Sequence, residues 1–273
     1  MPLEVGRSIV RLSSSVGDVL TFFVEPVLEN ATLVAAFEGW NDAGEAATGA
    51  ARYLEAAIRA VPLGEIDSEE FLDFTVRRPW ARAAAGGERT IEWPVTRLSY
   101  GACGERELVV AIGVEPHLRW RAYCDLFCGL VRRLGVMRVV LLGAYVADVV
   151  YSRPVDVSGF ASEAGRLAAI GVAPSHYEGP TGIVGVLGER LRADGVAVLS
   201  LWAGLPHYIS ASPNPRGSLA LVQKLASALP LAIDEAQLRD QATEFEQKIS
   251  ALVSGDPELS EYVRLLKKRE FAQ

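Results

Sequence analysis

The sequence predicts an α/β fold in which a parallel-rich sheet is covered by helices on both faces. Continuous apolar runs are typical of strands buried on both sides; they cover residues 33–37, 108–113, 139–142 and 196–201. Helices are predicted over residues 115–134, from apolar residues at helical spacing, and over residues 42–60, 181–192 and 215–229, from capping or helix-starting residues. Strands that alternate with helices of this length build largely parallel sheets.

The first predicted strand and helix meet at a short turn. An irregular lead-in with an extended piece around residues 19–24 precedes the strand 33–37. The strand stops at Gly39, and Asp42 caps the helix that follows. Glu45, three residues later, completes a capping-box pair with Asp42.

The next part of the chain is expected to be extended. Pro62 and Gly64 end the first helix, and residues 70–76 are predicted as a strand. A glycine-rich loop over residues 83–87 leads to residues 90–93, which we expect to form a hairpin arm.

The C-terminal fifth differs in composition and predicts a helical hairpin. Residues 234–253 are charged, with apolar side chains at spacings of three and four. Gly255 ends this helix, and Asp256-Pro257 caps a second helix with a basic end. We therefore expect an α/β core domain over residues 1–230 and a C-terminal hairpin over residues 231–273. Two helices cannot bury their own apolar seam, so the hairpin either packs on the core or projects as an oligomerisation or partner arm.

Composition and charge exclude several classes of protein. The chain has 273 residues, 50% of them hydrophobic and 22% charged, which is typical of globular proteins. A net charge of −7 gives no overall attraction to nucleic acid or anionic lipid. Three cysteines are too few for a disulfide scaffold, and neither a signal peptide nor an apolar run of about 18 residues is present. We therefore expect a cytoplasmic protein that binds no nucleic acid and no membrane.

The first candidate cluster lies where the first buried strand ends. It consists of Glu38, Gly39, Trp40, Asn41 and Asp42. Open α/β sheets collect ligands at the carboxyl ends of their strands. The turn accounts for Gly39 and the helix cap for Asp42, whereas Glu38 has no such structural explanation. Two roles stay open for this cluster, a structural or partner-contact role and a small-molecule site.

The second candidate cluster contains recurring glycines. Its members are Tyr177, Gly179, Thr181 and Gly182. The spacing fits neither the dinucleotide motif nor the phosphate loop of nucleotide-binding proteins. Thr181 is predicted as a helix N-cap, beside free amides that could hold an anion. Close helix packing, with Thr181 and Gly182 facing the same cleft as Glu38, is the competing interpretation.

The third candidate cluster follows the last buried strand. It comprises Trp202, His207, Tyr208 and Asn214. His207 is either an acid–base group or a hydrogen-bonded structural residue. The three histidines are scattered, and Cys124 and Cys128 read as small core residues on one helical face. The sequence therefore predicts no metal site and no cofactor.

In order and spacing, these motifs resemble the proteasome-assembly-chaperone family, in its second-subunit type and its actinobacterial branch. The motifs cover residues 37–44, 177–183, 201–202, 206–208 and 214–215. Further matches lie at residues 76–79, 93–94, 113–116, 142–144, 147–148 and 153–154. The resemblance extends over residues 30–270.

The resemblance implies a fold and a partner. It implies a three-layer fold of nucleoside-phosphorylase or hydrolase type, with a mixed, largely parallel sheet, and a homo-oligomer, for which a trimer is favoured. It also implies proteasome subunits as partners. Some archaeal relatives bind the proteasome through a C-terminal tail with a penultimate aromatic residue. Here Phe271 stands one place too early, so docking in that mode is not expected.

Two functions of different class remain open. The first is a chaperone-like protein that binds proteasome subunits or a related partner without catalysis. The second is a phosphorylase-, hydrolase- or ATP-grasp-related enzyme, or a small-molecule binder. In the second case Glu38, Asn41, Thr181 and His207 would converge on one ligand. The lack of a nucleophile, a metal set or a nucleotide loop favours the first, whereas polar residues at several strand ends favour the second.

Overall fold

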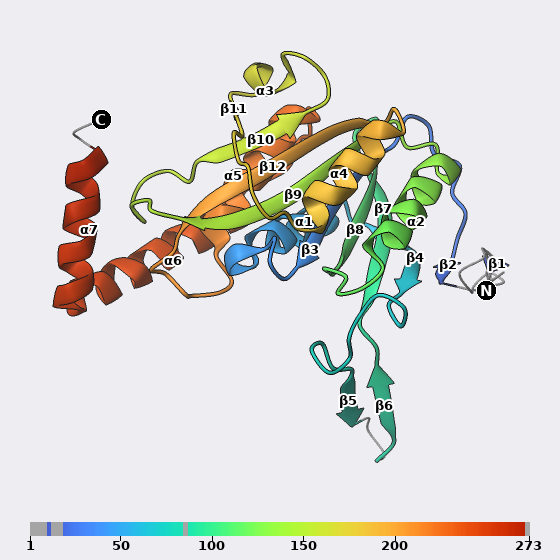
Figure 1. The fold of residues 1–273 in the computed structure, drawn as a ribbon, viewed down its shortest axis with the longest axis horizontal. Helices are drawn as coiled ribbons and strands as arrows, with labels where there is room; N and C mark the ends of the chain where they lie inside the picture. Colours follow the sequence, from blue (N-terminus) through green and yellow to red (C-terminus); the bar gives the residue numbers. More distant parts are fainter. Residues whose placement is uncertain (1–9, 12–18, 84–86, 271–273) are drawn as a thin grey trace.

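One large sheet dominates the computed structural model, which describes residues 10–11, 19–83 and 87–270 (Figure 1). From one edge to the other, its strands are β1 (Val10–Arg11), β2 (Leu20–Phe22), β4 (Val61–Asp67), β7 (Val95–Cys103), β8 (Arg106–Val114), β3 (Thr32–Glu38), β9 (Arg138–Ala147), β12 (Ala197–Pro206), β10 (Val157–Ala161) and β11 (Ala173–Pro174). The four central strands β8, β3, β9 and β12 are parallel, and antiparallel pairs flank them on both sides.

The central strands are the four apolar runs that the sequence predicts. In β3, Val34 lies between Val110 of β8 and Val140 of β9, and all three side chains are fully buried. Strands buried on both faces need such continuous apolar sequences. Because the four strands are parallel, their carboxyl ends meet at one edge of the sheet.

Helices cover both faces of the sheet and produce three layers, which confirms the predicted fold class. Helices α1 (Ala46–Ala57) and α5 (Pro215–Ala228) lie on one face, and α2 (Trp120–Arg133) and α4 (Ile183–Ala193) on the other. The turns η1 (Ala43–Glu45) and α3 (Arg166–Ala169) are short. Alanines of α1 are fully buried, and Gly49 faces Ser218 so closely that α1 and α5 pack tightly together. Cys124 and Cys128 are buried on α2, as predicted, and burial raises the pKa of the Cys124 thiol to about 12.

Three sequence predictions about secondary structure are wrong. Residues 70–76 form turns, in which the Asp73 carboxylate accepts the Thr75 amide. Pro62 and Gly64 lie within β4, because a bulge places Pro62 where the ladder is irregular. Strands β7 and β10 were not predicted. Both are antiparallel partners of the parallel centre, and they lack its continuous apolar sequence.

A two-stranded hairpin projects from the sheet, where the sequence predicts an arm. It consists of β5 (Trp80–Ala83) and β6 (Arg89–Glu92), and each of their residues is exposed. Figure 1 shows the hairpin extending away from the three layers. We call it the arm below.

Two C-terminal helices follow the core, close to their predicted bounds. Helix α6 (Ala236–Gly255) packs along α5, and α7 (Pro257–Glu270) leaves the end of α6 at a steep angle (Figure 1). Their seam forms a small separate core with Val150 of the β9–β10 loop. Residues 271–273, which include Phe271, lie outside the described residues, so the expectation that the chain lacks a docking tail stays a prediction. No helix in the described ranges combines the length and the apolar character that crossing a bilayer requires.

Candidate functional site

Polar side chains follow each of the four parallel strands at the carboxyl edge of the sheet. Glu38 ends β3, Glu115 follows β8, Asp148 follows β9 and His207 follows β12. This edge is where open α/β sheets place their sites. The contacts of these side chains divide them into separate groups.

The first group ties the β3 turn to the start of α4. The Asn41 amide nitrogen donates to Glu115 Oε1 at 2.7 Å, and the same oxygen accepts the backbone amide of Ile183 at 2.8 Å. Gly182 is the N-cap of α4, so the predicted N-cap at Thr181 is wrong. The carboxylate of Glu115, the residue after β8, accepts the amide of the first helical residue instead. A negative charge at a helix N-terminus is stabilising.

The tie leaves no room for a larger residue at position 182. A Cβ on Gly182 would lie 2.1 Å from Asn41 Oδ1 and 2.7 Å from Glu115 Oε1. Asn41 is fully buried, and its Oδ1 accepts no hydrogen bond from the described residues. Gly182 therefore lies directly against this oxygen, on the side where a larger residue would place its Cβ.

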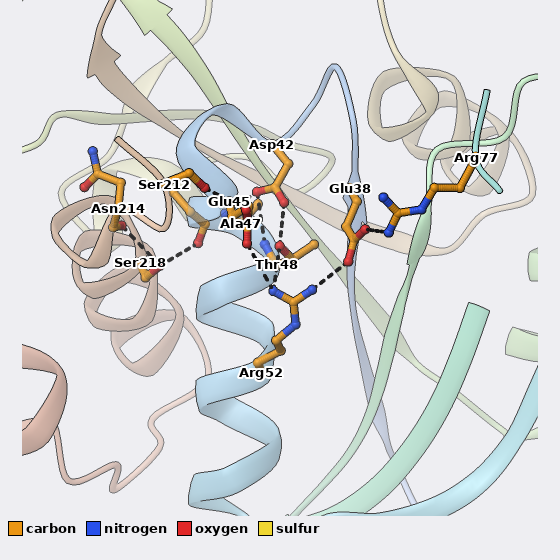
Figure 2. Close-up of polar contacts among 11 residues, drawn as sticks. Glu38, Asp42, Glu45, Ala47, Thr48, Arg52, Arg77, Ser212, Asn214 and Ser218 are labelled. Atoms are coloured by element: carbon orange, nitrogen blue, oxygen red, sulfur yellow. Dashed lines mark hydrogen bonds and ion pairs between the residues drawn. The ribbon is translucent and has the colours of Figure 1, made fainter. Parts of the chain in front are cut away.

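Asp42 fastens the turn to α1. Its Oδ1 accepts the amides of Ala47 at 2.7 Å and Thr48 at 3.1 Å, and its Oδ2 accepts the Thr48 hydroxyl (Figure 2). Asp42 thus caps α1, as predicted. It does not occupy the N-cap position, however, which is held by Glu45 three residues later. Burial raises the pKa of Asp42, and the hydrogen bonds from Thr48 and Ala47 oppose that rise.

The predicted capping box is wrong. Gly44 and Glu45 both have positive φ, so η1 separates Asp42 from the first turn of α1. The Glu45 carboxylate accepts the Ser212 hydroxyl instead of the backbone at the start of its own helix (Figure 2).

Glu38 bridges two arginines. Its Oε1 lies 2.6 Å from Arg52 of α1, and its Oε2 pairs with Arg77 of the turn before the arm. Figure 2 shows the carboxylate between the two guanidinium groups. The side chain of Glu38 is 27% exposed. This bridge supplies the structural explanation of Glu38 that the sequence did not offer.

We expect Glu38→Gln to lower stability only slightly, because partly exposed ion pairs contribute at most about 1 kcal/mol. Chemical denaturation at low and high salt measures the loss, which should shrink as salt screens the pairs. Glu92→Gln, which removes the exposed ion pair with Arg82, is the matched control. A loss several times larger than the control's would show that Glu38 does more than bridge two arginines.

Two members of the third predicted cluster, His207 and Tyr208, lie against helix α7. His207 Nδ1 is 3.0 Å from Asp148 Oδ1, and the His207 ring contacts the rings of Tyr208 and Tyr262 edge-on. Tyr262 belongs to α7, and Tyr208 donates to the carbonyl oxygen of Val149. The aromatic group therefore joins α7 to the carboxyl edge.

The other predicted residues have local structural contacts. The Asn214 side chain caps α5 by accepting the Gly217 amide, and the backbone amide of Asn214 donates to the Gly44 carbonyl oxygen. Tyr177 donates to the carbonyl oxygen of Pro180 beside Gly179. Four predicted residues remain. Gly39 has a φ of +119° and Trp40 is exposed, while Trp202 is half-buried against Gly143 and Thr181 lies against Gly185.

The structure brings together part of the predicted set. Asn41 and Gly182 meet at Glu115, and the β3 turn also reaches Asn214. The two described pockets do not unite Glu38 with Thr181 or His207: a pocket of about 230 Å³ is lined by Glu38, and one of about 290 Å³ between the core and α6 by Asn214. The assignment of the candidate cleft stays a prediction.

Sequence reasoning missed Glu115, Arg52 and Arg77 as members of the site. Glu115 directly follows a buried strand, as Glu38 does, but the sequence predicts it as the start of a helix, and that helix begins at Trp120. The two arginines reach Glu38 from 14 and 39 residues away. No local pattern reveals contacts of that kind.

Comparisons with known proteins agree on one family. The model of the PAC2 family matches residues 36–253. The Mycobacterium tuberculosis proteasome-assembly chaperone homologue Rv2125 is 41% identical, with a TM-score of 0.78 over 85% of this chain and 99% of that chain. A PAC2 family protein from Streptomyces avermitilis is also 41% identical, with a TM-score of 0.79 over the same shares.

An archaeal relative shares the fold at lower identity. The proteasome activator PbaB of Pyrococcus furiosus is 16% identical, with a TM-score of 0.68 over 85% of this chain and 97% of that chain. The search of curated proteins gives no significant match.

Proposed function

The chain belongs to the PAC2 family, and from this premise we propose that it binds proteasome subunits, in the manner of an assembly chaperone, without catalysing a reaction. The observation that carries the proposal is the 41% identity to the mycobacterial proteasome-assembly chaperone homologue, which spans 99% of that protein. The archaeal neighbours share only the fold with this chain, so they add support at the level of architecture.

The contacts at the carboxyl edge support a binding role. Glu38 is held by two arginines, Asp42 by α1, and Glu115 by Asn41 and the start of α4. A general base must reach a substrate proton, and these carboxylates are instead engaged by the protein's own donors. Exposed tryptophans, by contrast, are frequent in protein–protein interfaces.

The proposal includes a cytoplasmic homotrimer. On the face of the sheet that carries α4, aromatic side chains lie on the neighbouring strands β9, β12 and β10. By register, Tyr145, Trp202 and Phe160 share this face, and Tyr145 and Phe160 are exposed. Exposed apolar patches on a sheet are typical of contacts between subunits.

Capture from the organism of origin tests the proposed partner. We expect the tagged chain, purified under mild conditions, to enrich proteasome α- or β-subunits over an unrelated acidic protein with the same tag. Mass spectrometry identifies the subunits, and native mass spectrometry of the same preparation is expected to give a trimer. The proposal fails if no proteasome subunit is enriched while nucleosides, phosphate or nucleotides strongly raise the melting temperature.

A further inference from the structure

A small pocket opens at the base of the arm. Its volume is about 230 Å³, which is below the range of about 300–1,000 Å³ that is typical of sites for drug-sized ligands and cofactors. Residues from the start of β7 and the end of β8 line the pocket. Two tryptophans also line it: Trp80, the first residue of the arm, and Trp93, which directly follows the arm. The volume suits a side chain better than a cofactor.

The pocket is positively charged in an acidic protein. The charged residues that line it or pair with its lining are Arg52, Arg77, Arg78, Arg82, Arg97, Glu38 and Glu92. Glu65 lies opposite Arg97 in the β4–β7 ladder. Five arginines against three glutamates leave a surplus of two positive charges, although the whole chain carries −7. Within the described residues, neither Arg78 nor Arg97 forms an ion pair.

Large apolar side chains stand exposed around the same opening. Trp80 is 66% exposed and Trp93 is 56% exposed, and both line the pocket. Trp93 packs against Phe74 with ring centroids 5.0 Å apart, so its orientation is fixed. Tryptophan and arginine are the residue types that most often dominate the energy of protein interfaces.

The arm needs a further layer to become a stable sheet. Two strands of four residues, exposed throughout, are at best marginally stable in water. Among the described residues, β5 and β6 pair only with each other, so the outer edge of each strand offers backbone groups that an added strand could pair with. A small metabolite in the pocket would leave these edges uncovered, whereas an extended peptide segment would cover them.

We propose that the arm and the pocket at its base dock an extended acidic segment of a partner protein, which places one apolar side chain between Trp80 and Trp93. The acidic side chains of that segment pair with Arg78 and Arg97. The inference deepens the proposed function and rests on it in one respect, that the occupant is a protein.

A peptide of defined chemistry tests the docking site. The probe is a short, capped, fluorescent peptide in which glutamate and leucine alternate, and anisotropy measures its binding to the full chain. We expect binding that weakens with salt, and at least tenfold weaker binding for Arg78→Glu/Arg97→Glu and for Trp93→Ala. Both arginines are exposed, so their reversal should leave the fold intact, which thermal melting checks.

Matched controls use residues outside the pocket. Arg121→Glu reverses another exposed arginine, and Trp40→Ala removes a tryptophan that is 60% exposed and lines neither described pocket; both should bind like the wild type. Equal binding of a lysine–leucine or a glutamate–serine peptide would overturn the proposal, and so would variants that bind normally. A lower oligomer mass for Trp80→Ala/Trp93→Ala would assign the arm to a second copy of the chain instead.

The outcome is separable from the proteasome question. Peptide binding with the expected losses, together with a failed capture of proteasome subunits, would support the docking site and overturn only the proposed partner.

Discussion

Replacement of Gly182 by alanine is expected to lower the free energy of unfolding by about 3 kcal/mol, because overpacking and loss of buried hydrogen bonds act together. The new methyl group would overlap Asn41 Oδ1 and Glu115 Oε1. To make room, Glu115 must release either the Asn41 amide or the Ile183 amide, and each is a buried or half-buried donor. Chemical denaturation measures the loss.

Gly129 offers a control for the same change in sequence. It lies inside α2, and a Cβ there meets open space. Gly129→Ala is therefore expected to be neutral, or to stabilise by about 0.5–1 kcal/mol through helix propensity. A double-mutant cycle of Gly182→Ala and Asn41→Ala should show coupling: Gly182→Ala should cost less stability when Asn41 is already alanine, because the overlap with Oδ1 is then absent. If Gly182→Ala unfolds like the wild type, the hydrogen bonds of Glu115 with Asn41 and Ile183 do not hold the start of α4 in place.

Asp42→Ala is expected to destabilise the protein by about 2–3 kcal/mol, because it leaves buried donors without an acceptor. The Ala47 amide, the Thr48 amide and the Thr48 hydroxyl all donate to this carboxylate. Relief of the buried charge offsets part of the loss. Asp42→Asn keeps one acceptor for the amides and should cost less than half as much.

The pH dependence separates the charge from the hydrogen bonds. Burial raises the pKa of Asp42 above 3.8, so the folded protein holds this proton more tightly than the unfolded chain does. Stability from this group is fully present below pH 3.8 and falls as pH rises through the raised pKa. The advantage of the wild type over Asp42→Asn should therefore shrink from acid to neutral pH.

An exposed aspartate supplies the control for Asp42. Asp125→Ala removes one surface pair with Arg190 and should change stability by less than about 1 kcal/mol. Equal effects of Asp42→Ala and Asp125→Ala would contradict the assignment of Asp42 as the cap of α1.

The sequence could predict the centre of the sheet because burial on both faces demands unbroken apolar runs. Val34 and its neighbours on either side belong to such runs. The sequence does not predict β7 and β10, because antiparallel strands beside the centre tolerate polar and small residues. Arg97 on the solvent side of β7 is an example. Gly64 is predicted as the end of a helix, yet it lies inside a strand. Glycine disfavours helices, but it also fits a strand where another backbone passes closely.

The same limit applies to the candidate site. The rule that polar residues collect at strand ends selects Glu38 and Asn41 from the sequence alone. It does not show which partners they meet, because Arg77 and Glu115 lie 39 and 74 residues away from them in the chain. The sequence thus leaves a ligand-binding role open for Glu38, whereas in the structure this residue forms an ion-pair bridge. Only the tertiary contacts distinguish the two roles.

The position of β3 constrains the order in which the protein can fold during synthesis. This strand is made early, yet both of its neighbours, β8 and β9, are made later. The turn after β3 must also wait for Ile183 and Asn214 before α4 and α5 can be fastened to it. Since chains leave the ribosome at about 5–20 residues per second, this apolar strand stays unpaired in the nascent chain for several seconds, and during that time the chaperones of the cell can bind it.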